Sequence, residues 1–533
     1  MVAMLRVLGG FAGLNDRICG FLARHTVLSL LAFGLLLLAP GCQQIPATDR
    51  DESRYAQASR QIVETGEWGD IRFQDDLRLK KPPGIYWLQA GLREALGLPD
   101  RIASYRLTSL LGALGAVLLL FALARRCLDD ASAWLAPAAL AASFLLGAEA
   151  RLATTDAVLL CSTLAVGMVL TLRLTDRPLP SDDLLLAFAL AAGVLVKGPV
   201  ILVLLGGVVV TALLTRRARP LAGLLSWRAV ALFVSLALPW FWLIVARHGA
   251  AFWEQSLVRD VVGKAVSVQE SHGQPPGFYL LTLPIAGWPW AASLPAIIWL
   301  AWRERGQPLV LALIGWVVPF WVVFELAPTK LVHYVLPTYP ALILLAVMAW
   351  QRRSEWPAAV RYACLALFLL GVAMLAGAGV WLADHFGVRE PSGVAFAAAL
   401  VGGALLFLYR GRSLPWLFAG ISLAYVQFWG SLVPGSQALW VSHRVAALTA
   451  EARSGCDAPA VAEGFTEPSL VFELGTATRL GLPEPLPEGT HCRLRLSLQP
   501  LAGDGLREIG TVSGLNYSRG REVEVHAYIE SRR

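Results

Sequence analysis

The feature that most limits the fold of this chain is the recurrence of long apolar segments along almost its whole length. Stretches of roughly 17 to 25 residues, the length that crosses a bilayer as a helix, recur about thirteen times, and the fifth is too short to stand alone. They lie near 26–42, 102–124, 131–148, 154–172, 184–197, 199–215, 229–246, 279–301, 308–325, 332–350, 360–382, 393–408 and 414–432. Only 16% of the residues are charged, against about 25% in a soluble chain. The sequence therefore predicts an all-α, multi-pass membrane protein.

The arginines predict how these spans are oriented. Arginine pairs follow even-numbered spans, as at 125–126, 216–217 and 352–353, and further arginines precede the first span. Because short cytoplasmic loops are enriched in basic residues, the N-terminus is predicted to be cytoplasmic. An odd number of spans then places the tail, 434–533, on the outer side. The net charge of +7 follows from this arginine bias and gives no reason to expect nucleic acid as a partner.

The first apolar segment has two interpretations. Its end at Cys42 is reminiscent of a lipoprotein signal peptide, which would be cleaved. However, Ala39 occupies the position three before Cys42 where leucine is usual, and a polar loop follows at once. These features favour a retained first span, and a cleaved one would leave the following loop on the same side.

The polar tail predicts a separate domain. Residues 493–498 and 522–525 alternate polar and apolar side chains, which is typical of strands. We therefore expect a membrane domain at 1–433, with outer loops at 43–101 and 248–278, and a small extracytoplasmic α/β domain at 434–533. Cys456 and Cys492 lie in this tail, and an oxidising compartment would permit a disulfide between them, although spacing leaves the pairing open.

Polar residues outside the arginine loops gather on the predicted outer side. They are Asp51, Glu52, Lys80 and Lys81 after the first span, Glu149, Arg151 and Asp156 after the third, Lys197 after the fifth, Lys264, Glu270 and His272 after the seventh, and Lys330, His333 and Tyr334 after the ninth. Charged groups at a bilayer are costly and tend to be retained for function. This segregation predicts that they line one cavity at the outer membrane face.

Several of these residues also have a structural interpretation. Lys81 and Lys197 could be interfacial anchors whose ammonium groups reach water. His333 could form a hydrogen bond with the unpaired backbone groups at a helix end. Asp51 and Asp156 are the strongest functional candidates, because a carboxylate at the end of a span is costly unless it is used. The chain contains no G-x-x-x-x-G-K-[ST], H-E-x-x-H, C-x-x-C or G-x-S-x-G motif, so ATP-driven transport, zinc proteolysis, thiol redox chemistry and serine hydrolysis lack support.

The order of the motifs resembles a known family. The acidic pair and R-Y-A are followed by K-P-P-x-x-Y-W, A-R-x-x-x-x-D, K-G-P, E-S-H-G-x-P-P-x-x-Y and T-K-L-x-H-Y-x-L-P-x-Y-P. Over residues 45–345 this pattern resembles the bacterial C-type, polyprenyl-phosphate-dependent glycosyltransferases, which include lipid A aminoarabinose transferases and relatives of the protein O-mannosyltransferases. The resemblance implies the C-type glycosyltransferase fold and a monomeric, inner-membrane enzyme. Such an enzyme moves a sugar, with inversion, from a polyprenyl-phosphate donor to a lipid A or lipopolysaccharide acceptor.

The resemblance also implies roles for the residues. Asp51 matches the acid that would take a proton from the acceptor, and Asp156 matches a second acid; Glu52 is grouped with them as catalytic. Cations are needed where the leaving phosphate gains negative charge. The expected phosphate ligands are Lys80, Lys81, Lys264 and Lys330. The expected substrate-binding residues are Tyr55, Tyr86, Arg151, Lys197, Glu270, His272, His333 and Tyr334.

The sequence departs from the aminoarabinose transferases at two positions. Lys80 stands where those enzymes carry an acid, and an ungapped alignment places Val261 where they carry a histidine. No cofactor is therefore certain, although Glu270 and His272 could bind a divalent ion, and the sugar stays open. One alternative is a protein O-glycosyltransferase. Another is a non-enzymatic carrier or flippase for lipid-linked sugars, but a flippase needs charges deep within its spans, which are almost free of them here.

Overall fold

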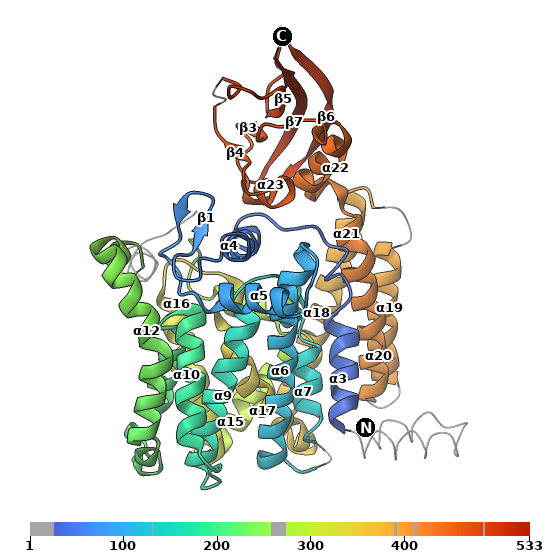
Figure 1. Cartoon of the computed structure of the whole chain (residues 1–533). Helices are drawn as coiled ribbons and strands as arrows, with labels where there is room; N and C mark the ends of the chain where they lie inside the picture. The colour runs from blue at the N-terminus through green and yellow to red at the C-terminus, as the bar shows by residue number, and fades with distance from the viewer. Residues whose placement is uncertain are drawn as a thin grey trace.

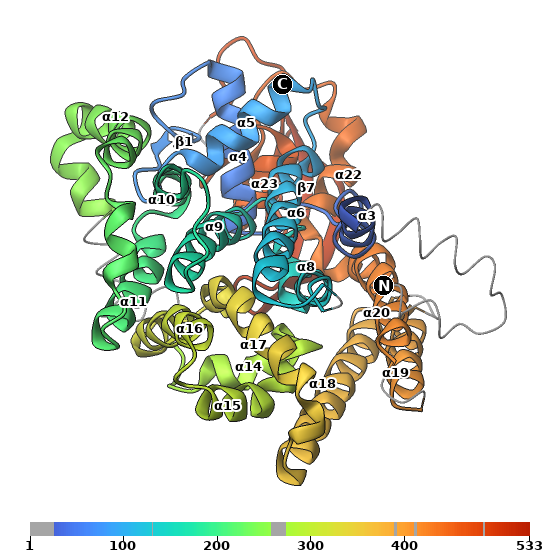
Figure 2. The ribbon, with the colours of Figure 1, turned by 90° about the horizontal axis from the view of Figure 1, so that it is seen from below.

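The structure, a computed structural model, consists of a helical bundle with a small mixed domain above it (Figure 1). It describes residues 26–130, 132–256, 273–388, 392–409, 413–482 and 485–532. Three predicted site residues, Lys264, Glu270 and His272, lie outside these ranges. Seen from below, α9 to α12 lie on one side of the bundle and α18 to α20 on the other (Figure 2).

Eight of the predicted spans are helical segments long and apolar enough to cross a membrane, counted within the described ranges. They are α6 (Ile102–Cys127), α9 (Asp156–Leu174), α12 (Trp227–Phe252), α16 (Pro308–Leu326), η4 with α17 (Val332–Thr338 and Tyr339–Gln351), α18 (Ala358–His385), α19 (Ser392–Tyr409) and α20 (Leu414–Gln427) continued by η6 (Phe428–Leu432) and α21 (Val433–Gly435). Short 3-10 turns, η1 (Arg219–Leu224) and η5 (Arg353–Glu355), lie in two of the connections. The chain is therefore a multi-pass membrane protein.

The other five predicted spans are shorter or interrupted, so thirteen uninterrupted spans are not confirmed. Three are short helices: α3 (Thr26–Leu38), α10 (Asp182–Lys197) and α11 (Val200–Leu214). Segment 131–148 divides into α7 (Leu135–Ala141) and α8 (Phe144–Glu149), and segment 279–301 divides into α14 (Phe278–Ala286), η3 (Trp290–Ser293) and α15 (Leu294–Arg303). The two breaks meet, because Trp290 Nε1 donates to Ser143 Oγ at 2.8 Å. Hydropathy measures apolar length and is insensitive to such breaks in the backbone.

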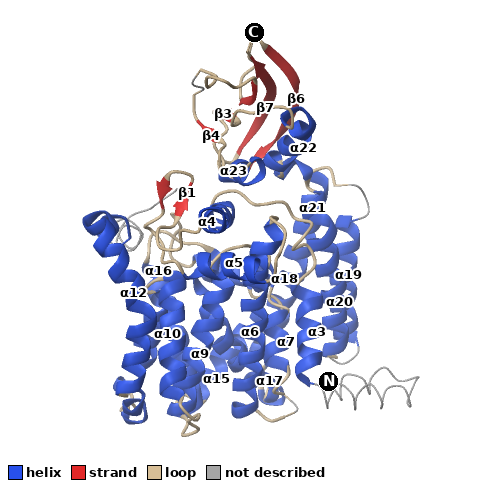
Figure 3. Ribbon diagram, viewed as in Figure 1, coloured by secondary structure: helices blue, strands red, loops and turns tan. Residues whose placement is uncertain are grey.

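The loop after α3 folds into a layer that covers one end of the bundle (Figure 3). It contains α4 (Asp51–Thr65), the two-residue strands β1 (Arg72–Phe73) and β2 (Asp76–Leu77), and α5 (Gly84–Ala95). Tyr55 and Ile62 of α4 pack with Ile85 and Tyr86 of α5 in a small apolar cluster. The layer therefore has its own core and can hold polar side chains against the helix ends below.

The C-terminal domain is a mixed sheet with two helices, which agrees with the predicted α/β character. After short turns at η6 (Phe428–Leu432), α21 (Val433–Gly435) and η7 (Gln437–Leu439), it contains α22 (Val441–Arg453), β3 (Val461–Glu463), α23 (Pro468–Leu474), β4 (Arg479–Leu480), β5 (Cys492–Ser497), β6 (Leu506–Asn516) and β7 (Arg521–Ser531). The strand order is β4-β3-β5-β7-β6. Strand β3 runs parallel to β4 and β5, while β7 runs antiparallel to β5 and β6.

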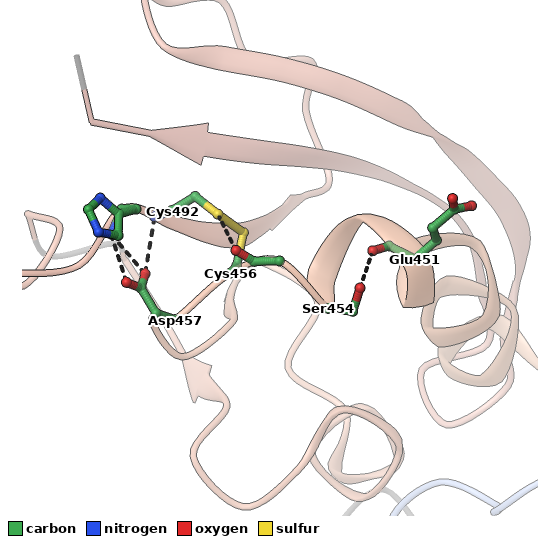
Figure 4. Close-up of a disulfide and its surroundings, with 7 residues drawn as sticks. Glu451, Ser454, Cys456, Asp457 and Cys492 are labelled. Carbon is green, nitrogen blue, oxygen red and sulfur yellow. Dashed lines mark hydrogen bonds between the residues drawn. A yellow bond between two sulfur atoms is a disulfide. The ribbon is translucent and has the colours of Figure 1, made fainter.

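The domain is held together by an apolar core and one disulfide. Leu494 and Leu496 of β5 are fully buried and pack with Val445 of α22 in one apolar cluster. Cys456, in the loop after α22, is bonded to Cys492 at the start of β5 (Figure 4). The disulfide fixes the end of the helix to the first residue of a central strand.

Candidate active site

Two adjacent carboxylates at the start of α4 have opposite surroundings. The side chain of Asp51 is 65% exposed, and its Oδ1 lies 3.9 Å from Arg54 Nη1. The side chain of Glu52 is 1% exposed. Asp51 is therefore available to an incoming molecule, whereas Glu52 is enclosed by protein.

Glu52 is bound on both carboxylate oxygens. Arg106 of α6 donates from Nε to Oε1 at 2.7 Å and from Nη2 to Oε2 at 2.8 Å. The backbone amides of Ala153 and Thr48 donate to the same two oxygens at 2.8 and 2.9 Å. Such a bidentate, fully hydrogen-bonded pair fixes geometry. Glu52 was expected to be catalytic. These contacts instead favour a structural role, in which Glu52 connects α4 to α6 and to the turn before α9.

Arg106 did not figure among the residues expected from the sequence. It lies inside a predicted span and is completely buried. It also donates to the backbone carbonyls of Cys42, Ile45 and Pro46 at 3.1, 2.5 and 2.9 Å. A single arginine inside an apolar helix is a signal that could have identified it, because such a charge requires a partner.

A second cluster of polar residues forms where several helices end. Asp156 is the first residue of α9, and Lys197 is the last residue of α10. The Lys197 Nζ atom lies 2.6 Å from Asp156 Oδ1. His333 of η4 lies between two carboxylates, with Nδ1 3.3 Å from Glu149 Oε1 and Nε2 3.8 Å from Asp156 Oδ2. The motifs A-R-x-x-x-x-D, K-G-P and T-K-L-x-H-Y therefore meet in space, as the single-cavity hypothesis predicts.

The local backbone explains how this cluster forms. Gly198, directly after Lys197, has φ 68° and ψ −144°, a conformation that glycine adopts far more readily than other residues. This ends α10 at the lysine and turns the chain toward α11. The Lys197 ammonium also lies 5.5 Å from the ring centroid of Tyr334, which is within cation–π range. Tyr334 is thereby part of the same cluster.

Three of these side chains could together bind a metal ion. One ligand atom each from Glu149, Asp156 and His333 lie within 4.8 Å of one another. Two carboxylates and an imidazole suit a divalent ion. However, Lys197 already occupies one oxygen of Asp156, so an ion would have to compete with an ammonium group. The donor set therefore fits a metal only if Lys197 moves away. The sequence predicted Glu149 to line the cavity but gave it no specific role.

Aromatic rings and a guanidinium form the wall next to Asp51. The rings of Tyr55 and Tyr86 lie 5.3 Å apart, and Arg78 Nε donates to Tyr86 Oη at 3.1 Å. Burial raises the pKa of Tyr55 well above its ordinary value, and negative charge on Tyr86, Asp51 and Asp156 raises it further. Val158 of α9, two residues after Asp156, packs against the apolar cluster that contains these two tyrosines. The layer that carries Asp51 therefore lies on the helix that carries Asp156. Sequence reasoning missed Arg78, although it stands three residues before the K-P-P motif.

The lysines of the K-P-P loop face the solvent side of this region. Lys80 is exposed and Lys81 is half-buried, whereas Pro82 and Pro83 are buried. A Cβ on Gly84 would come within 2.7 Å of the Leu195 carbonyl oxygen. The loop therefore rests on the last turn of α10, directly beside Lys197, and only glycine permits this approach.

Two other predicted site residues bind backbone carbonyls. Lys330 is buried, and its Nζ donates to the carbonyls of Gln274 and Ala327 at 2.9 and 2.8 Å. Arg151 donates from Nε to the Pro40 carbonyl at 2.6 Å, and its guanidinium lies 4.7 Å from the Trp429 ring centroid. These contacts connect segments of the backbone, so they favour structural roles over contact with substrate.

Comparison with known proteins gives matches in both sequence and fold. Residues 26–254 match the family dolichyl-phosphate-mannose-protein mannosyltransferase. Over 374 residues the chain is 31% identical to the undecaprenyl phosphate-alpha-4-amino-4-deoxy-L-arabinose arabinosyl transferase of Pseudomonas paraeruginosa, covering 68% of this chain and 66% of that protein. The second enzyme of this name from Pseudomonas fluorescens is 29% identical over 364 residues, with 65% and 60% coverage. The alignments therefore span just under two thirds of these relatives.

Two solved structures share the fold. ArnT from Cupriavidus metallidurans bound to undecaprenyl phosphate superposes with a TM-score of 0.74 at 20% identity, covering 94% of this chain and 97% of that one. The archaeal oligosaccharyltransferase AglB from Archaeoglobus fulgidus, in complex with an inhibitory peptide and a dolichol-phosphate, has a TM-score of 0.52 at 12% identity, with 86% and 65% coverage. At these identities the likeness concerns the fold, and it extends over the C-terminal domain in the first case.

Proposed function

We propose that this chain is a C-type, polyprenyl-phosphate-dependent glycosyltransferase and that it transfers a sugar from a polyprenyl-phosphate donor to a lipid A-type glycolipid. One observation carries the proposal. The layer that carries Asp51 packs directly on the helix that carries Asp156, since Val158 of α9 packs against the cluster of Tyr55 and Tyr86. Lys197 and His333 both lie beside Asp156. Sugar transfer needs an acid–base group and cations in one place, and this site supplies both.

The proposed chemistry is a single displacement with inversion. Asp51 removes the proton from the acceptor hydroxyl as it attacks the anomeric carbon of the sugar. Positive charge on Lys81 and Arg78 stabilises the phosphate as it leaves, because the phosphate carries more negative charge in the transition state than in the donor. The predicted substrate-binding residues Tyr55 and Tyr86 are buried, so we assign them to holding Arg78 beside the site, with Lys80 at the solvent edge.

The buried cluster has a different proposed role. Asp156 and Glu149 hold His333 and Lys197 so that two cationic groups point toward the sugar and phosphate, with Tyr334 beside them. A divalent ion held by Glu149, Asp156 and His333 would supply positive charge in place of Lys197, which would have to leave Asp156 first. Lys264, Glu270 and His272 stay predicted contributors from the 248–278 loop, whereas Glu52, Arg151 and Lys330 are assigned to holding the backbone.

We further propose that the site faces the periplasm from a bacterial inner membrane, with a cytoplasmic N-terminus. Helix α6 begins beside the loop layer and ends with Arg125 and Arg126 at the far end of the bundle. Basic residues at the end opposite the C-terminal domain support this orientation under the positive-inside rule. The disulfide in the C-terminal domain supports an oxidising compartment for that domain.

The test compares wild type with Asp51→Asn in a host that lacks the gene. Lipid A, core oligosaccharide and glycoproteins are extracted and analysed by mass spectrometry. We expect a sugar-sized mass increase on lipid A with wild type and none with Asp51→Asn. Asp75→Asn is the matched control, because Asp75 is an exposed aspartate of the same loop; it should retain the product.

The same experiment separates the alternatives. A product on glycoproteins alone would indicate the protein O-glycosyltransferase, which the matched family model and the AglB fold leave as the second candidate. Identical profiles in both strains, with wild-type protein in the membrane and donors supplied, would overturn the enzyme proposal in favour of a carrier. The charged residues of the candidate site, Asp51, Asp156, Lys197 and His333, lie in or beneath the loop layer at one end of the bundle, which favours chemistry at one membrane face.

A further inference from the structure

The residue directly before Asp51 has an unusual backbone. Arg50 has φ 63° and ψ −106°, and its carbonyl oxygen accepts the first bond of α4, from the Arg54 amide at 3.0 Å. A positive φ is disfavoured for a residue with a large side chain. Such a conformation persists only where surrounding contacts fix it.

Those contacts come from the C-terminal domain, more than 400 residues away in the chain. The Asp49 amide donates to Tyr517 Oη at 2.6 Å, and Arg50 Nη2 donates to the Ser518 carbonyl at 2.7 Å. Ser469 Oγ donates to Asp49 Oδ1. The two residues before Asp51 are therefore held on both backbone and side chain.

The part of the domain that makes these contacts is itself fixed. Tyr517 and Ser518 lie in the turn between β6 and β7, which we call the hairpin tip (residues 516–521). Asn516 Nδ2 and Arg519 Nε both donate to Glu467 Oε1, at 2.9 and 3.1 Å. Because Glu467 directly precedes α23, the hairpin tip and the start of α23 form one unit facing Asp49.

The same domain also holds α4 further along its length. Arg60 Nη1 donates to the Phe472 carbonyl at 2.7 Å, and its guanidinium lies 4.1 Å from the Phe472 ring centroid. Gln57 Nε2 donates to Thr476 Oγ1 at 2.7 Å. In Figure 1, α23 lies next to α4 on the side away from the bundle. The helix is thus clamped between the bundle and the domain.

We propose that the C-terminal domain positions the catalytic base: Asp49 and Tyr517 hold Arg50 in its strained conformation, and this conformation directs Asp51 into the site. The inference rests on the proposed role of Asp51 and deepens it. Asp49 and Tyr517 are positioning residues that act through the backbone. If the contacts of the hairpin tip with Asp49 and Arg50 are lost, the backbone at Arg50 relaxes to a favoured conformation. The first turn of α4 then rotates, and the Asp51 carboxylate no longer points into the site.

The first test is Tyr517→Phe in the purified full-length protein, measured by hydrogen exchange and by transfer kinetics. Loss of the hydroxyl leaves the Asp49 amide without its acceptor. We expect faster exchange confined to residues 48–55 and roughly a three- to tenfold fall in kcat, the range that one hydrogen bond supports. The KM for the polyprenyl-phosphate donor should change less than twofold, because the phosphate-binding residues are untouched.

Tyr528→Phe is the matched control. Its hydroxyl accepts from the Leu501 amide at 3.1 Å inside the same domain, so the substitution removes the same kind of bond away from Asp49. It should leave exchange at 48–55 and kcat unchanged. Equal behaviour of the two variants would overturn the inference. If wild type transfers no sugar, the proposed function fails, while hydrogen exchange alone decides whether the domain holds this segment.

A second test compares glycine with alanine at position 50. Both Arg50→Gly and Arg50→Ala lose the bond to Ser518, but only glycine adopts the positive φ without cost. We expect Arg50→Gly to retain more activity than Arg50→Ala, and Tyr517→Phe to cost less in the glycine background than in wild type. Equal activities of the glycine and alanine variants would show that the backbone strain has no part in positioning Asp51.

Discussion

Glu52 and Asp156 are both buried carboxylates paired with a cation, yet their surroundings differ. Glu52 receives two bonds from one guanidinium and two from backbone amides, and its side chain is 1% exposed. Asp156 is paired with an ammonium group and a histidine, and the histidine is 24% exposed. Arginine stays protonated, whereas lysine and histidine can exchange protons and move. The first pair fixes structure, and the second retains groups that can respond to a substrate.

The comparison also explains why adjacent acidic residues have different fates. On a helix, consecutive side chains point about 100° apart, so Asp51 and Glu52 cannot face the same surroundings. Glu52 faces α6 and the turn before α9, where Arg106 neutralises it. Asp51 points away from the Glu52–Arg106 pair and stays exposed. Because Glu52 is fixed in its buried position, the orientation of Asp51 is fixed as well.

Breaking the closed pair should have the largest effect. Glu52→Ala leaves the Arg106 guanidinium buried without a counter-charge, which costs about 3–5 kcal/mol. We expect little folded protein in the membrane, measured by detergent-extracted yield and thermal unfolding. The double variant Glu52→Gln with Arg106→Met should recover part of the stability. A stable, active Glu52→Ala enzyme would contradict the structural assignment.

Removing the exposed acid should affect activity alone. Asp51→Asn keeps the shape of the side chain but cannot accept a proton, and loss of a general base costs roughly 10²- to 10⁴-fold in kcat. The unfolding temperature should equal that of wild type, because the side chain is largely exposed. Turnover and thermal unfolding measured on one preparation check both parts. An equal loss of stability would place Asp51 with Glu52.

A change in the open cluster should have an intermediate effect. His333→Gln keeps a polar group between Glu149 and Asp156 but removes a group that can be positively charged, so we expect roughly a 10- to 100-fold fall in kcat. The matched control is His443→Gln, because His443 also lies beside a glutamate, 3.2 Å from Glu473 in the C-terminal domain. The control should transfer sugar at the wild-type rate. A fall shared by both variants would remove His333 from the site.

The smallest effect concerns the pH dependence of domain docking. Burial raises the pKa of Asp49 from 3.8 to about 6, with a further increase from Glu467 and a decrease from Ser469 and Arg50. Because the folded-state pKa is raised, the neutral acid stabilises the docked state fully below pH 3.8. This contribution is lost as the pH rises through about 6. We expect a decrease of a few degrees in Tm over this window, which Asp49→Asn should remove.

His443 also contributes to the pH dependence of stability, and its contribution must be distinguished from that of Asp49. A hydrogen bond from the His443 ring to the Glu473 carboxylate raises the pKa of His443. The charged form of His443 therefore also stabilises the fold at low pH, and this effect is lost as the pH rises. Arg519, paired with Glu467, keeps its charge throughout. The difference between wild type and Asp49→Asn isolates the aspartate. If the two proteins have the same pH profile, Asp49 does not titrate in this window.

Local patterns in the sequence determined much of this protein. Apolar segments and arginine-rich loops predict a multi-pass bundle, and the alternating tail predicts the C-terminal domain, because bilayer solvation and strand periodicity depend on neighbouring residues. The order of short motifs predicts a common site, and the structure brings Asp156, Lys197 and His333 together. Five predicted spans nevertheless proved short or broken.

Only the tertiary structure decided which charges are free. Glu52 finds its partner 54 positions away in Arg106, Lys330 finds backbone carbonyls, and Asp49 finds a hairpin of the C-terminal domain. These pairings depend on where helices end and which faces meet, and no local pattern encodes that. A charged side chain near a membrane needs a partner, and long-range packing determines what that partner is. A residue paired with other protein groups is structural, whereas a residue left without such a pair can bind a substrate.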